Sequence, residues 1–123
     1  MNKKEIYHLL KRYRYIVEAV QKGEPDVEIR ISGRREYIKI DTKILTFVEI
    51  VQIIYNNVSD TRIKKFMDMT IMRGKPNTRA YSMEPLDKST YYRYKSRFVD
   101  ILYHCCIYKK LVTMEEILAE KIV

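Results

Sequence analysis

The sequence contains little of what ends or interrupts helices. Its 123 residues include three glycines, three prolines and no tryptophan. Glycine and proline are the residues that most often mark turns and terminate helices, so their scarcity predicts a mainly α-helical fold with few sharp turns. The small number of glycines also argues against a glycine-rich loop that cradles phosphate groups.

Long hydrophobic runs are absent as well. No stretch approaches the roughly 18 apolar residues that a membrane-spanning helix needs. The opening sequence Met-Asn-Lys-Lys-Glu leads into an amphipathic segment and not into a signal peptide. Because 46% of the residues are nonetheless hydrophobic, the chain can bury a core. We therefore expect a folded cytoplasmic protein with no membrane segment.

Catalytic and metal-binding motifs are missing too. The only cysteines, Cys105 and Cys106, are adjacent, which is not the spacing of a zinc site, and the only histidines are His8 and His104. None of the common nucleotide-binding, metalloprotease or serine-hydrolase motifs occurs. We expect no enzyme, no metal and no cofactor, with one thiol buried and one partly exposed on a helix.

Positive charge is the property that the chain has in excess. The 24 lysines and arginines outnumber the 16 acidic residues, and the whole excess of +8 falls between Arg62 and Lys110. A basic half on a small protein predicts a polyanionic partner. DNA, RNA and an anionic membrane all satisfy that prediction, so a motif is needed to choose among them.

Apolar spacing predicts the elements of the N-terminal part. We expect one amphipathic helix over 5–21, ended by Gly23 and Pro25, and a β-hairpin whose strands are 27–31 and 37–40. The next helix, about 42–55, is apolar most of the way round. We expect this helix in the core or in a dimer interface, which motivates the hypothesis of a homodimer.

Four more helices follow along the chain. Ser59 or Asp60 caps a helix over 61–72, and shorter and longer helices are predicted over 78–83 and 88–108. In the C-terminal segment, Thr113 and Glu116 stand at the spacing of a capping box, which opens a last helix. We group these elements as one helical domain with an N-terminal interaction part (1–58), a helix-turn-helix part (59–110) and a C-terminal helix (111–123).

The segment 86–98 resembles the DNA-reading helix of a helix-turn-helix. Asp87 suits the N-cap, and four apolar or aromatic residues follow at helical spacing, namely Tyr91, Tyr94, Phe98 and Leu102. The other face carries cations and short hydrogen-bonding groups, namely Lys88, Ser89, Thr90, Tyr92, Arg93, Ser96 and Arg97. Such a face at the N-terminal end of a helix suits insertion into a major groove. A solvated surface helix that is merely basic is the alternative.

The predicted contacts divide into those that position the protein and those that read sequence. Three cations before the helix, Arg73, Lys75 and Arg79, are expected to hold phosphates. Arg93 and Arg97 can reach guanine edges or phosphates, and Tyr92 can bond a phosphate, pack on a thymine methyl group or simply be a half-exposed aromatic ring. The 11 tyrosines also allow base stacking on single strands or RNA, although most lie at core spacing.

These residues resemble a known family. The hydrophobic central helix, the phrase at 60–66 and the phrase at 86–95 are similar to small late-gene regulators of phages and prophages of Gram-positive bacteria, of the RinA, ArpU and LtrC types. In the sigma-factor region-4-like motif of that family, Leu86, Asp87, Thr90, Tyr92 and Arg93 match the conserved phrase. The chain departs from the motif before the turn, where Glu84-Pro85 stands in place of Leu-Gly.

The resemblance covers about residues 41–105 and implies a sequence-specific activator of late packaging and structural genes that binds double-stranded DNA. It also implies action on host RNA polymerase. Within DNA binding, a small terminase subunit is the alternative function. A protein-interaction module that binds RNA polymerase and touches DNA weakly is the alternative from another class.

Overall fold

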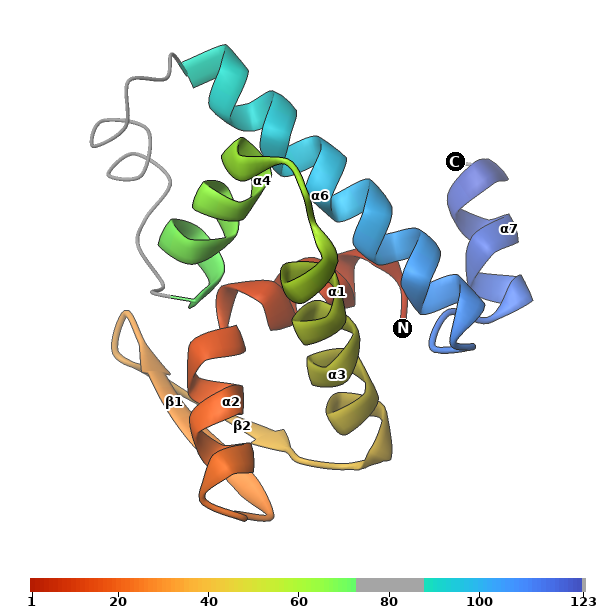
Figure 1. Cartoon of the computed structure of the whole chain (residues 1–123). Coiled ribbons are helices and arrows are strands. Elements are labelled where there is room, and N and C mark those ends of the chain that lie inside the picture. The colour runs from red at the N-terminus through yellow and green to blue at the C-terminus, as the bar shows by residue number, and fades with distance from the viewer. Residues whose placement is uncertain (73–87, 123) are drawn as a thin grey trace.

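Helices dominate the structure, as the scarcity of glycine and proline predicts. A computed structural model describes residues 1–72 and 88–122, and Figure 1 shows helices surrounding one core with a small two-stranded antiparallel sheet at one side. The elements in chain order are α1 (Lys3–Lys11), α2 (Tyr13–Gln21), β1 (Asp26–Ile31), β2 (Arg34–Lys39), α3 (Thr42–Asn57), α4 (Thr61–Phe66), the π-helix η1 (Met67–Met72), α6 (Lys88–Tyr108) and α7 (Met114–Ile122). The predicted helix over 78–83 lies outside the described residues.

The prediction of a single helix over 5–21 is wrong, because the helix is interrupted at Arg12. The backbone there has φ −110° and ψ 6°, and the Arg12 N–H donates to the carbonyl of Leu9 at 3.1 Å. The carbonyl of His8, the normal helical acceptor, instead receives the Arg12 guanidinium at 3.1 Å. The guanidinium also donates to Glu36 of β2 at 2.7 Å. The apolar stripe continues across the break, so periodicity does not reveal it.

The hairpin is confirmed, but its turn is shorter than predicted. Ser32 and Gly33 form a two-residue loop with φ values of 51° and 78°, the left-handed conformations of a type I′ turn. Arg34 and Arg35 consequently belong to β2 and not to the turn. Alternation places Ile29 and Ile38 against the core and turns their neighbours outward.

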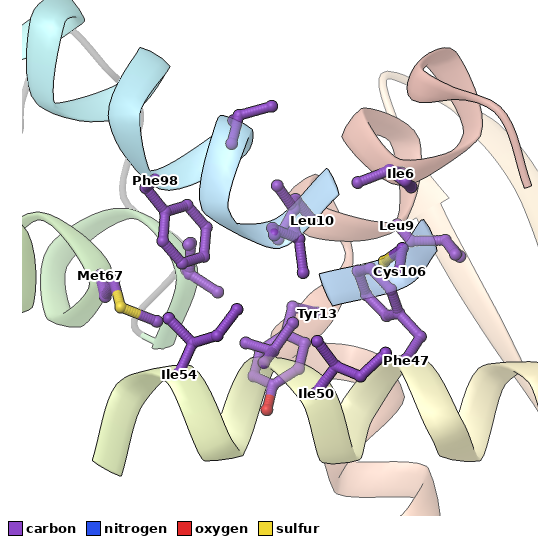
Figure 2. Close-up of a cluster of buried hydrophobic side chains, with 14 of the residues drawn as sticks. Ile6, Leu9, Leu10, Tyr13, Phe47, Ile50, Ile54, Met67, Phe98 and Cys106 are labelled. Carbon is purple, nitrogen blue, oxygen red and sulfur yellow. The ribbon is translucent and has the colours of Figure 1, made fainter. Parts of the chain in front are cut away.

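α3 lies at the centre of the core. Of the two predicted places for this helix, the core and a dimer interface, the structure thus shows the core. Asp41 caps the helix by accepting from the Ile44 N–H at 3.0 Å. One side of α3 is buried through Ile44, Phe47, Ile50, Val51 and Ile54. Figure 2 shows labelled side chains from α1, α3, η1 and α6 converging on this side. Leu45 and Ile53 stay 46% exposed, so only a small part of the apolar surface that motivated the dimer hypothesis is left outside the core.

α4 and η1 together fill the span of the helix predicted over 61–72. Asp60, one of the two predicted caps, accepts from the Arg62 N–H at 2.9 Å. Phe66 packs on Phe98 of α6 with ring centroids 5.9 Å apart and planes tilted by 55°. Met67 is fully buried beside them. This aromatic contact fixes α6 on α4.

The predicted capping box opens α7. The Thr113 N–H donates to the Glu116 carboxylate and the Glu116 N–H donates to the Thr113 hydroxyl, both at 3.1 Å. The Met1 amine also lies 3.0 Å from that carboxylate and bonds the Leu111 carbonyl. Hydrogen bonding from Thr113 and the nearby amine together lower the pKa of Glu116 against the opposing effect of burial.

Candidate nucleic-acid interface

α6 separates a buried face from an exposed one along its length. Tyr94, Phe98, Leu102 and Cys106, spaced four residues apart, are buried, and Val99 lies with them. The prediction that Tyr94, Phe98 and Leu102 face the core is confirmed. The helix boundaries also agree with the predicted span of 88–108. The Asp87 cap and the side chain of Tyr91 lie outside the described residues.

The opposite face brings five of the predicted site residues to the surface. These five side chains, which we call the reading face, are all exposed and are Ser89, Tyr92, Arg93, Ser96 and Arg97. Arg73, Lys75 and Arg79 lie outside the described residues, as do the turn before α6 and the side chains of Lys88 and Thr90. The structure therefore places the second helix of the predicted motif and leaves the first without a structural account.

Aromatic rings, rather than carboxylates, hold the cations near the reading face. The Arg93 guanidinium lies 5.8 Å from the centroid of the Tyr94 ring, and the Lys95 ammonium lies 5.6 Å from that of Tyr92. A ring attracts a cation through its quadrupole without cancelling its charge. These contacts orient the long basic side chains and leave their positive charge available to an anion.

Arg62 of α4 extends this basic surface and was not among the predicted site residues. Its guanidinium donates to the Tyr94 hydroxyl at 2.9 Å, and that hydrogen bond raises the pKa of Arg62. Tyr94 thus links the buried side of α6 to an exposed arginine on the neighbouring helix. The sequence shows Arg62 only as one cation of a basic half, because the contact spans 32 residues.

Ion pairing differs sharply between the two halves of the chain. Among the described residues, with the amino group of Met1 included, every ion pair has its carboxylate outside α4 and α6. The pairs are Met1 with Glu116, His8 and Arg12 with Glu36, Lys22 with Glu18, and Arg35 with Glu28. None of these pairs involves Arg62, Arg93, Lys95 or Arg97 of the basic half.

Other site chemistry finds little support in the described part of the chain. No group of three or more His, Cys, Asp or Glu side chains there can hold a metal ion. Burial raises the pKa of the Cys106 thiol to about 11, so it stays protonated near neutral pH and is a poor nucleophile. Cys105 is half-buried, so the predicted pair of one buried and one partly exposed thiol is confirmed. Within the same residues, the helices are too short or too polar to span a bilayer.

Comparison with known proteins adds no further assignment. No protein-family model, curated protein or solved structure matches this chain. The similarity to late-gene regulators consequently remains a resemblance in residues 41–105.

Proposed function

We propose that this protein binds double-stranded DNA by inserting the reading face of α6 into the major groove, and that it regulates transcription. The observation that supports the proposal is the joint exposure of Arg93 and Arg97 on a helix whose other face is anchored in the core. A groove-reading helix needs a rigid support and a face free of internal salt bridges, and α6 has both among its described residues.

The two arginines are spaced for neighbouring contacts on DNA. Four residues along an α-helix correspond to about 6 Å, so their guanidinium groups can reach adjacent base pairs or a base edge and a phosphate. Ser89 and Ser96 are short enough to approach base edges or backbone oxygens from the same face. Tyr92 can pack on a thymine methyl group or bond a phosphate.

Buried residues of α6 supply the support that this geometry requires. Phe98 and Leu102 are fully buried, and the Phe66 ring and the Arg62 hydrogen bond to Tyr94 hold the N-terminal half of the helix from a second element. A helix fixed in this way presents its arginines in a constant direction. Constant direction is what distinguishes sequence recognition from general attraction to a polyanion.

The biological role that we propose follows from the resemblance. The resemblance of residues 41–105 to late-gene regulators, with a sigma-region-4-like motif at about 76–103, supports an activator of phage late genes that works with host RNA polymerase in the cytoplasm. The DNA contact and the polymerase contact are separable, because the reading face occupies only one side of one helix. Binding to DNA is thus the part to test first.

The test compares two double variants that lose the same charge. R93A/R97A removes the central arginines of the reading face, and R30A/K39A removes two exposed cations from the hairpin. Fluorescence anisotropy is measured on a duplex from upstream of the neighbouring operon and on a scrambled duplex. We expect R93A/R97A to weaken binding to the first duplex by about 100-fold or more, since each good arginine contact contributes about 1–3 kcal/mol.

The control variant should bind as the parent protein does. Equal effects of the two variants would mean that net charge alone drives binding, and the proposal would then fail. Intact binding by R93A/R97A would favour a protein-interaction module that contacts RNA polymerase. Assembly of many copies into a ring on the same DNA would favour a small terminase subunit.

A further inference from the structure

α1 begins beside the C-terminal part of α6, and interactions near both ends of α1 reach side chains of α6. The Lys3 ammonium lies 5.0 Å from the centroid of the Tyr103 ring, and Lys11 lies close enough to Lys95 to affect its protonation. The partners are eight residues apart on each helix and occur in opposite order. In Figure 1 the chain begins beside the C-terminal part of α6 and α1 leads back from there.

Folding brings Lys11 within electrostatic range of Lys95, and the two charges repel. Burial and, after it, the charge of Lys11 lower the pKa of Lys95. Neither lysine has an ion-pair partner among the described side chains, whereas Arg12, the next residue along, is paired with Glu36. Like charges brought together without a carboxylate favour binding of an anion at that position.

A basic groove continues from this point along α1. The groove has a volume of about 550 Å³ and is lined by Lys4, Tyr7, His8, Lys11 and Arg12. Because Arg12 and His8 both contact Glu36, the unbalanced charge of the groove comes from the two lysines. Lys4 and Lys11 lie on one side of α1, about 10 Å apart along its axis. That separation corresponds to about three successive phosphates at 3.4 Å per nucleotide.

We propose that the DNA-binding surface continues from α6 across Lys95 onto α1, where Lys4 and Lys11 contact the phosphate backbone of the same duplex. This inference rests on the proposed function and extends it to a second helix. Lys95 connects the two parts, since its ammonium lies 5.6 Å from the ring centroid of Tyr92 in the reading face and within electrostatic range of Lys11. Ammonium groups at these positions fix the orientation of the duplex and read no sequence.

The test measures affinity against salt for K4A/K11A, R93A/R97A, R30A/K39A and the parent protein. Fluorescence anisotropy is recorded on the operon duplex and on the scrambled duplex. We expect K4A/K11A to bind both duplexes about 30-fold more weakly at about 0.15 M salt. Affinity varies with salt concentration to the power of about −0.9 for each phosphate contact, so each lost contact weakens binding about 5.5-fold at that concentration. The slope of log affinity against log salt should fall in magnitude by about 1.8, with the ratio between duplexes unchanged.

The outcomes separate this inference from the proposed function. If K4A/K11A matches R30A/K39A while R93A/R97A loses binding, the α1 contact is overturned and the α6 contact stands. If the parent binds neither duplex, both proposals fail. Vesicles of phosphatidylcholine and phosphatidylserine are the second probe, and capture by them that depends on Lys4 and Lys11 without duplex binding would overturn the inference in favour of a membrane surface. Circular dichroism before and after heating confirms that each exposed-site variant folds.

Discussion

Cations of the N-terminal half and of the α4–α6 half have different kinds of partner. Arg12, Lys22 and Arg35 each lie within 3.3 Å of a carboxylate, and residues 1–61 carry a net charge of only +2 in the sequence. Arg62, Arg93 and Lys95 contact tyrosine hydroxyls or rings instead. The first three cations are thus paired with acids of the chain, whereas aromatic contacts orient the other three and leave their charge uncancelled. We infer that the paired charges serve stability and that the others serve the proposed binding.

The largest expected effect comes from removing the anchor of the basic half. Phe98→Ala deletes a fully buried ring that packs on Phe66, and we expect a loss of about 3–5 kcal/mol in the free energy of unfolding. Urea denaturation measures this loss. Tyr108→Ala, on the same helix but 82% exposed, should change stability by less than about 0.5 kcal/mol. A loss below about 1 kcal/mol for Phe98→Ala would show that α6 is not anchored as described.

A smaller effect is expected where the N-terminal half pairs its charges. Glu36→Gln weakens the contacts to Arg12 and His8 that hold α1 against β2, and we expect a loss of about 1 kcal/mol with unchanged affinity for DNA. Urea denaturation compares the free energy of unfolding of this variant with that of Glu28→Gln, which removes an exposed ion pair with Arg35 on the hairpin. A defect in DNA binding after Glu36→Gln would contradict the expectation that the ion pairs of the N-terminal half contribute only to stability.

The stabilisation from the Glu36 contacts should depend on pH in a definite direction. Burial raises the pKa of Glu36, but the hydrogen bonds from Arg12 and His8 outweigh it and lower the pKa below the ordinary value of 4.5. The stabilisation is therefore complete above that value and is lost as the pH falls through the lowered pKa. The stability difference between the parent and Glu36→Gln should shrink as the pH falls below about 4.5 and Glu36 takes up its proton. A difference that does not shrink below that pH would contradict this assignment.

The smallest expected effect on stability has the opposite sign. Lys11→Glu replaces the repulsion with Lys95 by an attraction, so we expect a gain of a few tenths of a kcal/mol, measured as a small rise in Tm. The same change should weaken DNA binding more than Lys11→Gln does. A rise in stability together with a loss of affinity is the pattern expected of charges that serve binding. Equal DNA affinity for the two variants would remove Lys11 from the interface.

Local sequence signals predicted much of this fold. The α6 boundaries, the alternation of the hairpin strands, the caps at Asp41 and Asp60 and the Thr113–Glu116 capping box all depend on residues within a few positions of one another. The exposure of Arg93 and Arg97 follows from helical periodicity in the same way.

Contacts between distant residues account for what the sequence did not reveal. The break at Arg12 depends on Glu36, which is 24 residues away, and the proximity of Lys11 and Lys95 depends on how α1 lies on α6. Arg62 reaches Tyr94 across 32 residues. No periodic pattern encodes such distances, so the continuation of the basic surface onto α1 that we propose could be inferred only from the folded chain.

The most direct test of the central claim is the affinity of the unaltered protein for duplex DNA. Fluorescence anisotropy across a range of salt concentrations would compare the duplex from upstream of the neighbouring operon with its scrambled counterpart. The account predicts that the first is bound about 10³-fold more tightly or better, with affinity that falls as salt rises. Equal and weak binding to both duplexes would contradict it and would mean that the reading face of α6 is only an electrostatic patch.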